Sequence, residues 1–157
     1  MIDRLPVTDG LVQLLETVTG RPVGRRTVPL DAQGRAVTPP YTILYPLERV
    51  DDTNTLADDQ RATVLDYQAT FISGPTPRDP DSRGGDEQAQ WLTDRGWKVV
   101  ERHADGRPGY MHPINVGPGV VCWRREAREA GGMSDPNDAI INSVIRYRLF
   151  LEEQPGG

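Results

Sequence analysis

Four aspartates close together in the sequence are the first residues that could do chemistry. They form two pairs, Asp51-Asp52 and Asp58-Asp59, with Asn54 between them. Carboxylate oxygens grouped in this way can bind a hard cation, which in turn could serve a nuclease or another small metal-dependent hydrolase. The spacing is not that of an EF-hand loop and lacks the glycine at its sixth position. Because Asp and Asn are also common turn residues, we predict a solvated acidic loop over 47–59, with a subunit interface or a metal site as the alternatives.

The remaining nucleophiles and soft metal ligands form no recognisable site. His103, His112 and Cys122 are separated by nine and ten residues, which matches no zinc-binding pattern. None of the serines lies in a G-x-S-x-G nucleophile elbow. The Gly-Pro-Gly turn at 117–119 lacks the lysine and the Ser or Thr of a phosphate-binding loop. We therefore expect a protein that is not an enzyme and that has no metal and no cofactor.

Arginine supplies 17 of the 18 basic residues, since Lys98 is the only lysine. A GC-rich coding genome would account for this choice, and arginine also suits bidentate interface pairs better than lysine does. The formal net charge of −5 and the lack of a basic run in the sequence argue against tight binding to DNA phosphates. Glu126 and Glu129, which flank Arg128, favour ion pairs within or between subunits. The candidate interface residues are Arg124, Arg125, Arg146, Arg148, Asp51, Asp52, Asp58 and Asp59.

Two long runs of alternating polarity must form the strands that position two of these arginines. In the run from Arg61 to Ser73, the apolar side chains are Leu65, Tyr67, Ala69 and Phe71. In the run from Ile141 to Glu152, they are Ile141, Ile145, Tyr147, Leu149 and Leu151. Period-two alternation predicts a sheet with one face on a core. The other face, which carries Arg146 and Arg148, can meet water or another subunit.

Two helices are expected to flank the sheet. The first begins with Thr8 or Asp9 as its cap and ends at Gly20, and its apolar stripe comprises Leu11, Leu14, Leu15 and Val18. The second covers about 86–100 and contains Gly96, which lowers helix propensity but permits close packing on the sheet.

Shorter strands are predicted at 41–45, 114–116 and 120–124, with Pro46 limiting the pairing of the first. Gly and Pro total 30 residues (16 + 14), and they place long connections at 20–40, at 74–85 and around Gly131, Gly132 and Pro136. The result is a single α+β domain, 1–157, with a mainly antiparallel sheet of four to five strands, two flanking helices and long Gly/Pro-rich loops. The tail from 153 to 157 is expected to fray.

The chain is also expected to be cytoplasmic and independent of membranes. Its first residues lack the apolar stretch of a signal peptide. No apolar run approaches the roughly 20 residues needed to cross a bilayer. The single cysteine, Cys122, excludes an internal disulfide bond.

Several segments occur in a characteristic order over residues 40–152. Their sequences are PYTILYP (40–46), LADD (56–59), YQATF (67–71), EQAQWLTDR (87–95) and IRYRL (145–149). This succession resembles tail terminator proteins of long-tailed bacteriophages, especially those of actinobacterial hosts. The resemblance lies in the order and local character of the segments rather than in an invariant motif.

The resemblance implies a structural virion protein that forms a homo-hexameric ring. Such a ring caps the head-proximal end of the tail tube, stops its polymerisation and joins it to the neck. Its expected partners are the major tail tube protein and a neck or head-completion protein, and viral DNA passes through its channel without being read. The expected location is the tail–neck junction of the virion, and the host cytoplasm during assembly. The alternatives are another neck component and a metal-dependent hydrolase that uses the acidic loop.

Overall fold

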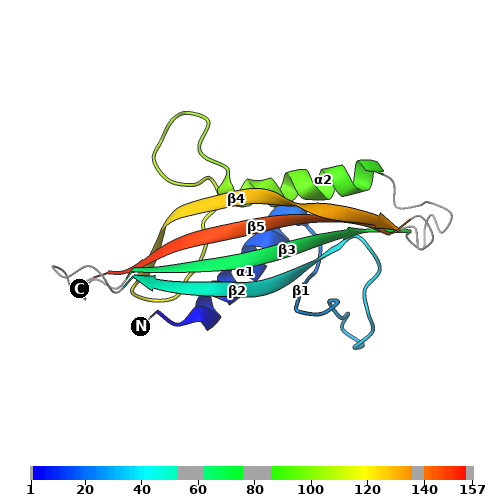
Figure 1. Ribbon diagram of the computed structural model, residues 1–157, viewed down its shortest axis with the longest axis horizontal. Coiled ribbons are helices and arrows are strands. Elements are labelled where there is room, and N and C mark those ends of the chain that lie inside the picture. The colour runs from blue at the N-terminus through cyan, green and yellow to red at the C-terminus, as the bar shows by residue number, and fades with distance from the viewer. Residues whose placement is uncertain (1, 53–61, 76–85, 136–139, 155–157) are drawn as a thin grey trace.

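The computed structural model describes residues 2–52, 62–75, 86–135 and 140–154 (Figure 1). Along the chain, the elements are α1 (Arg4–Thr19), β1 (Val23–Arg25), β2 (Tyr41–Asp52), β3 (Ala62–Ser73), α2 (Asp86–Trp97), the 3₁₀ turn η1 (Lys98–Val100), β4 (Val120–Asp135) and β5 (Ile140–Glu153). The strands form one sheet in the order β1-β2-β3-β5-β4, in which only β1 and β2 are parallel. The predicted α+β class with a mainly antiparallel sheet is confirmed.

Both helices lie on the same face of the sheet, so that the molecule has two layers (Figure 1). From α1, Thr8 contacts the Tyr67 hydroxyl of β3. From α2, Gly96 contacts Tyr147 of β5 and the ring of Phe71. The core lies between the layers and includes the apolar stripe of α1, Leu92 of α2 and the inward side chains of β3 and β5. We call the opposite side of the sheet the open face, because no described helix covers it.

The two long alternating strands are confirmed. Every second residue of β3 is buried, and in β5 the same alternation begins at Ile145. The two strands pair antiparallel in the centre of the sheet, with Tyr67 opposite Tyr147 on the core side and Asp66 opposite Arg148 on the open face. In-register residues of neighbouring strands point to the same side. The strict alternation therefore separates the core from the open face across both central strands.

Helix α1 begins earlier than predicted. Its N-cap is Asp3, whose carboxylate accepts a hydrogen bond from the Leu5 N–H (3.1 Å), whereas Thr8 and Asp9 lie inside the helix. Pro6 is tolerated there because the N–H groups of a first helical turn have no partner within the helix. The predicted end at Gly20 is confirmed, since this residue has a left-handed φ of 66° and its N–H donates to the Glu16 carbonyl.

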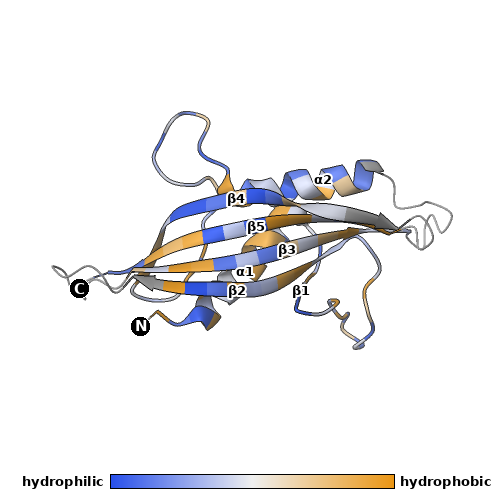
Figure 2. Ribbon diagram, in the orientation of Figure 1, coloured by the Kyte–Doolittle hydropathy of each residue, from blue (hydrophilic) through white to orange (hydrophobic). Residues whose placement is uncertain are grey.

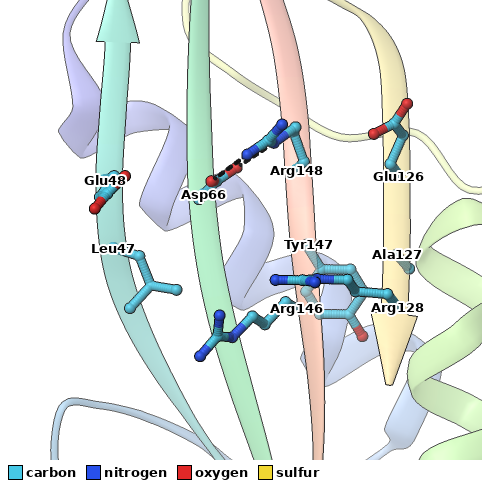
Figure 3. A pocket seen from close by; sticks show the side chains of 9 residues that line it. All are labelled: Leu47, Glu48, Asp66, Glu126, Ala127, Arg128, Arg146, Tyr147 and Arg148. Carbon is cyan, nitrogen blue, oxygen red and sulfur yellow. Dashed lines mark hydrogen bonds and ion pairs between the residues drawn. The ribbon is translucent and has the colours of Figure 1, made fainter. Parts of the chain in front are cut away.

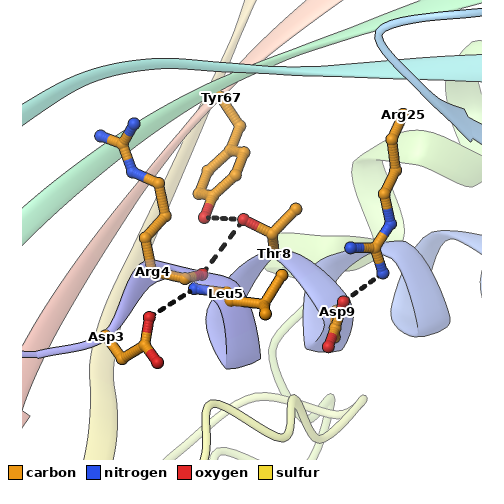
Figure 4. A network of polar contacts seen from close by, with 7 residues as sticks. All are labelled: Asp3, Arg4, Leu5, Thr8, Asp9, Arg25 and Tyr67. Carbon is orange, nitrogen blue, oxygen red and sulfur yellow. Dashed lines mark hydrogen bonds and ion pairs between the residues drawn. The ribbon is translucent and has the colours of Figure 1, made fainter.

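Thr8 joins α1 to the sheet. Its hydroxyl donates to the Arg4 carbonyl (3.1 Å), so the buried Tyr67 hydroxyl is the donor in its contact with Thr8 (2.9 Å; Figure 4). Burial raises the pKa of Tyr67, and the nearby positive charges of Arg4 and Arg25 oppose that rise. Nearby, Arg25 of β1 forms an ion pair with Asp9, so that the middle of α1 is held at two places.

Replacing Thr8 by valine should lower the free energy of unfolding by about 1–3 kcal/mol, because the buried Tyr67 hydroxyl loses its partner. Chemical denaturation would measure the change. Thr17→Val is the matched control, since the exposed Thr17 hydroxyl makes the same bond back along the helix, to the Gln13 carbonyl, but has no contact with the sheet. Equal losses in the two variants would contradict the role of Thr8 as a link.

Strand β2 is longer than the predicted 41–45. It passes through Pro46 to Asp52, so Asp51 and Asp52 belong to a strand rather than to a loop. Strand β1 pairs with β2 only as far as Leu44. Beyond Leu44 no described strand pairs with the outer side of β2, and such an edge tolerates proline. The register with β3 shifts between Pro46 and Arg49. Asp58 and Asp59, the other half of the predicted acidic loop, lie outside the described residues.

The predicted connection over 20–40 contains a strand. The three residues of β1 are too few to show an alternating pattern, and they pair parallel with residues 42–44 of β2. Gly24 lies in this strand, and a side chain there would clash with the backbone carbonyl of Thr27. The chain thus folds back over its own first strand, which explains why glycine occupies this position.

The C-terminal half differs most from expectation. Residues 114–116 are not a strand, and β4 does not end at Arg124 but continues through Gly131 and Gly132. Its register with β5 shifts between Cys122 and Arg124 and again between Glu129 and Gly132. Gly131 has a φ of 90°, a conformation that bulges often require of glycine. The prediction of a loop around Gly131, Gly132 and Pro136 is therefore wrong as far as Asp135, where the chain is still a strand. Pro136 itself lies outside the described residues.

The second helix begins at Asp86 as predicted, and the helical turn continues as η1 to Val100. Gly96 makes the close packing that was expected of it, since a Cβ atom there would clash with the ring of Phe71. The fraying predicted from residue 153 is wrong for its first two residues. Glu153 ends β5, and the Gln154 N–H donates to the Gly119 carbonyl (2.8 Å). Among the described residues, no helix is long and apolar enough to cross a membrane.

Candidate functional site

A row of charged side chains crosses the middle of the open face. Asp66 of β3 lies opposite Arg148 of β5, which in turn lies opposite Glu126 of β4. Glu48 enters the same row from the irregular part of β2 (Figure 3). These residues line a hollow of about 630 Å³ on the sheet surface. The alternating pattern of β3 and β5 directs Asp66 and Arg148 away from the core.

Arg148 is the centre of this row. Its Nε and Nη2 atoms donate to the two carboxylate oxygens of Asp66, at 2.8 and 2.9 Å (Figure 3). These hydrogen bonds and the charge of Asp66 raise the pKa of Arg148, and Glu126 and Glu48 add to the effect. An exposed pair of this kind contributes at most about 1 kcal/mol to folding. Its main consequence is that the planar guanidinium is held in one orientation on the open face.

Arg124 is the second ion-paired arginine of the open face. Its Nη2 atom lies 2.7 Å from a carboxylate oxygen of Glu126, and its guanidinium lies 5.5 Å from the centre of the Phe150 ring. The ion pair that the neighbouring glutamates predicted is therefore present, and it lies within the subunit.

Arg125 lies on the other side of the sheet and is only 8% exposed. Consecutive strand residues point to opposite faces, so Arg124 and Arg125 cannot share a surface. The Arg125 Nη1 atom donates to the carbonyls of Val99 (2.9 Å) and His112 (2.7 Å), and its guanidinium stacks 4.5 Å from the Tyr110 ring centre. Burial lowers its pKa, and Cys122 opposes that shift. Arg125 is thus a structural residue that holds the segment after α2 against the sheet. The prediction that grouped it with Arg124 as an interface residue is corrected accordingly.

An apolar stripe, which the sequence analysis did not identify, borders the charged row. Val50, Val64 and Phe150 lie side by side on β2, β3 and β5. The ring of Trp123 on β4 lies 5.4 Å from that of Phe150. Val50 and Trp123 are 53% and 50% exposed. Figure 2 shows the hydrophobic stretch that these strands share near one end of the sheet, beside the hydrophilic middle. Val64 and Phe150 could have been noticed as apolar residues at polar positions of the alternating runs.

Arg146 and Arg128 form a third row beside the charged one. They lie directly opposite each other on β5 and β4, and both are exposed. Arg146 is therefore on the surface where the sequence placed it. Arg128, which the sequence analysis noted only for its glutamate neighbours, belongs to the same surface. The open face thus combines apolar, ion-paired and purely basic parts within one sheet.

The possible metal ligands do not gather in the described part of the chain. No group of three or more His, Cys, Asp or Glu side chains that could hold a metal ion occurs there. His112 instead pairs with Glu101, at 3.0 Å. Burial raises the pKa of the half-buried Cys122 thiol. The aspartates Asp51 and Asp52 are the last residues of β2.

Comparison of the chain with protein-family models and with curated proteins gives no match.

Proposed function

We propose that the chain is a structural protein of a phage tail, namely a tail terminator that forms a hexameric ring on the head-proximal end of the tail tube. It carries out no reaction and needs no cofactor. Its partners are further copies of itself, the tail tube protein and a neck protein. The order of sequence segments over residues 40–152 supports this proposal, and so does the character of the open face.

The apolar stripe beside the charged row is the observation that carries the proposal. Contiguous apolar side chains on an exposed surface with a polar rim are typical of protein interaction sites. Aromatic residues and arginine are enriched in such interfaces, and both occur here in Trp123, Phe150, Arg124 and Arg148. A sheet face that carries an exposed stripe of large apolar side chains is a poor surface for a free monomer and a suitable one for an assembled subunit.

A ring also requires two different contact surfaces on each subunit, because its contacts are heterologous. The sheet supplies two unlike edges, β4 with its bulges and arginines, and the outer part of β2 with Pro46 and Glu48. The net charge of −5 agrees with a channel that lets DNA pass without holding its phosphates.

Electron-microscopy class averages of the protein mixed with assembled tail tubes test this proposal. We expect six-fold rings at one end of each tube. Bare tubes beside unattached protein would contradict the terminator function. Attachment to isolated head connectors, with tubes left bare, would indicate a neck component instead.

Replacing Arg148 by glutamate should leave the monomer folded, with a change in stability of no more than about 1 kcal/mol, and should impair assembly. The reason is that the reversed charge faces Asp66, Glu126 and Glu48 on the proposed contact surface. Circular dichroism would report folding and native mass spectrometry the number of subunits. Arg107→Glu is the control, since Arg107 also forms an exposed ion pair, with Asp105, away from the sheet. Unchanged assembly of the Arg148 variant would exclude an essential role for Arg148 in the interface.

A further inference from the structure

The outer side of α2 carries an exposed aromatic residue between two carboxylates. Glu87, Trp91 and Asp94 are exposed at i, i+4 and i+7 spacing, so they share one side of the helix. Trp91 is 42% exposed, although the Arg95 guanidinium lies 5.4 Å from its ring centre. Within the described residues, neither Glu87 nor Asp94 makes an ion pair. Both carboxylates are therefore available to a cation from outside the subunit.

Two arginines of the open face are in the complementary situation. Arg128 and Arg146, which we call the basic row, lie directly opposite each other on β4 and β5. No carboxylate of the described chain pairs with either of them, whereas Arg124 and Arg148 are both ion-paired. Like charges at such positions destabilise a sheet by an amount on the order of 0.2–1 kcal/mol. Two carboxylates from another molecule would remove the repulsion.

The two arginines also face the same space. Figure 3 shows Arg128 reaching from β4 over β5, and Arg146 reaching from β5 over β3, on the side of the hollow. Both residues line this hollow of about 630 Å³. Acidic side chains entering from solvent would meet both guanidinium groups without displacing any residue of the core.

The spacing of the open face matches the width of a helix. The apolar stripe at Phe150 and the basic row at Arg146 are four residues apart on β5, which is about 13 Å at 3.3 Å per residue. A helix with its side chains is about 10–12 Å wide. A helix that lies over the charged row would therefore touch the apolar stripe on one side and the basic row on the other.

Helix α2 has its exposed side chains arranged for both contacts. At about 3.6 residues per turn, Glu87 and Asp94 lie within roughly 20° of each other around the helix, and Trp91 lies about 40–60° to one side of them. In one of the two directions in which the helix can lie, the carboxylates reach the basic row and the indole reaches the apolar stripe. The outer side of α2 thus complements the open face in both charge and polarity.

A nucleic acid fits the open face poorly. Asp66, Glu126 and Glu48 stand on the same surface as the basic row, and the chain as a whole has a net charge of −5. Two phosphate contacts beside three carboxylates give little affinity at physiological salt. A protein surface with two carboxylates is the better match, because only two charges need to be met.

The outer side of α2 and the open face are separate surfaces of one subunit, because α2 packs on the opposite side of the sheet (Figure 1). A contact between them is heterologous, and repeated contacts of this kind close into a ring where the rotation between neighbours allows it. Every subunit then supplies one helix and one sheet face, and each open face gains the cover that it lacks in the single subunit.

We propose that the outer side of α2 in one copy of this chain docks on the open face of a second copy. Glu87 and Asp94 bind the two arginines of the basic row, and Trp91 packs on the apolar stripe. This inference rests on the proposed function insofar as a ring is the assembly in which each copy makes the contact once on each side. It adds the residues that form the contact and the charge pattern that selects the partner.

Charge-swapped subunits test the contact. One variant carries Arg128→Glu and Arg146→Glu, and the other carries Glu87→Arg and Asp94→Arg. Each alone should need about ten-fold higher protein concentration or more to assemble, because like charges then meet at every contact. An equal mixture of the two should assemble again, since alternating subunits restore opposite charges at every contact. Native mass spectrometry at low salt, with and without tail tubes, measures the number and the kind of subunits per ring.

Circular dichroism checks that each variant is folded. Should Glu87→Arg and Asp94→Arg unfold α2, the neutral pair Glu87→Gln and Asp94→Asn takes their place and should weaken assembly in the same direction. The control is the double variant Arg35→Glu and Arg107→Glu, which lowers the net charge as far as the basic-row variant does, at two exposed ion pairs outside the sheet. It should assemble like the wild type.

Normal assembly of either folded variant alone, or failure of the mixture of folded variants to assemble, would overturn the proposed contact. Rings that form normally from the basic-row variant but no longer cap tubes would overturn it too, and would assign the two arginines to the tube protein instead. A wild-type protein that stays monomeric even with tubes would likewise contradict the contact.

Failure of this inference can be told apart from failure of the proposed function. Wild-type rings that cap tubes, together with no rescue in the mixture, would leave the terminator function standing without this contact. Rescue in the mixture by a protein that caps no tubes would establish the contact and contradict the terminator function.

Discussion

Replacing Tyr147 by alanine should lower the free energy of unfolding by about 3–5 kcal/mol, as truncation of large buried aromatic side chains generally does. Tyr147 lies on the central strand β5 and is only 1% exposed. Its hydroxyl donates to the Gly96 carbonyl of α2 (2.6 Å), and its burial raises its pKa. The substitution would therefore open a cavity between β5 and α2 and also leave a buried carbonyl without its donor.

Chemical denaturation of two variants separates these contributions. Tyr147→Phe keeps the ring and removes only the donor, and it should cost about 1–3 kcal/mol. The remainder of the loss in Tyr147→Ala then belongs to the cavity. A loss of less than about 1 kcal/mol in the alanine variant would contradict the placement of this side chain in the core.

Replacing Gly10 by alanine should lower the free energy of unfolding by about 3 kcal/mol, at the upper end of the range for overpacked sites. Alanine in an open helical position would instead stabilise α1 by about 1 kcal/mol. The difference arises because a Cβ atom at position 10 would clash with the backbone carbonyl of Asn115. A side chain could swing away, but a backbone carbonyl cannot move without displacing the whole segment before β4.

Thermal or chemical unfolding would measure this effect. Gln13→Ala is the control, since Gln13 is exposed on the same helix and its change should stay within about 0.5 kcal/mol. Stabilisation by Gly10→Ala would mean that the segment around Asn115 does not lie against α1. The helical glycines Gly10 and Gly96 thus set how closely the helices approach their neighbours.

The sequence predicted those strands whose pattern is set by a single physical requirement, the burial of one face. Strands β3 and β5 alternate because each has one buried face, and that pattern is visible without any structure. Strand β4 was predicted only over its first residues, 120–124, because its two register shifts interrupt the alternation and because Gly131 and Gly132 are typical of loops. Strand β1 has only three residues, and the start of α1 was obscured by Pro6, whose presence a first turn tolerates.

The sequence likewise predicted only some of the residues of the open face. Arg146 and Arg148 were placed correctly because they occupy polar positions of an alternating strand. Arg125 was grouped with Arg124 by proximity in sequence, although neighbouring strand residues point to opposite faces. The apolar stripe was missed because Val50 belongs to a segment that was predicted to be a loop. The position of Val50 on the sheet follows from its pairing with Val64, and no local sequence pattern reveals that pairing.

The order of the strands in the sheet has a consequence for how the chain is made. Strand β5 is the last strand along the chain, yet it lies between β3 and β4. Its pairing with β3 joins residues as distant as Asp66 and Arg148, 82 positions apart, and pairing over such a separation is slow to form. A chain that stops before residue 140 lacks the centre of the core and most of the open face. Insertion of β5 therefore completes both the core and the open face in one step, so that a chain truncated before β5 would lack the contact surface proposed above.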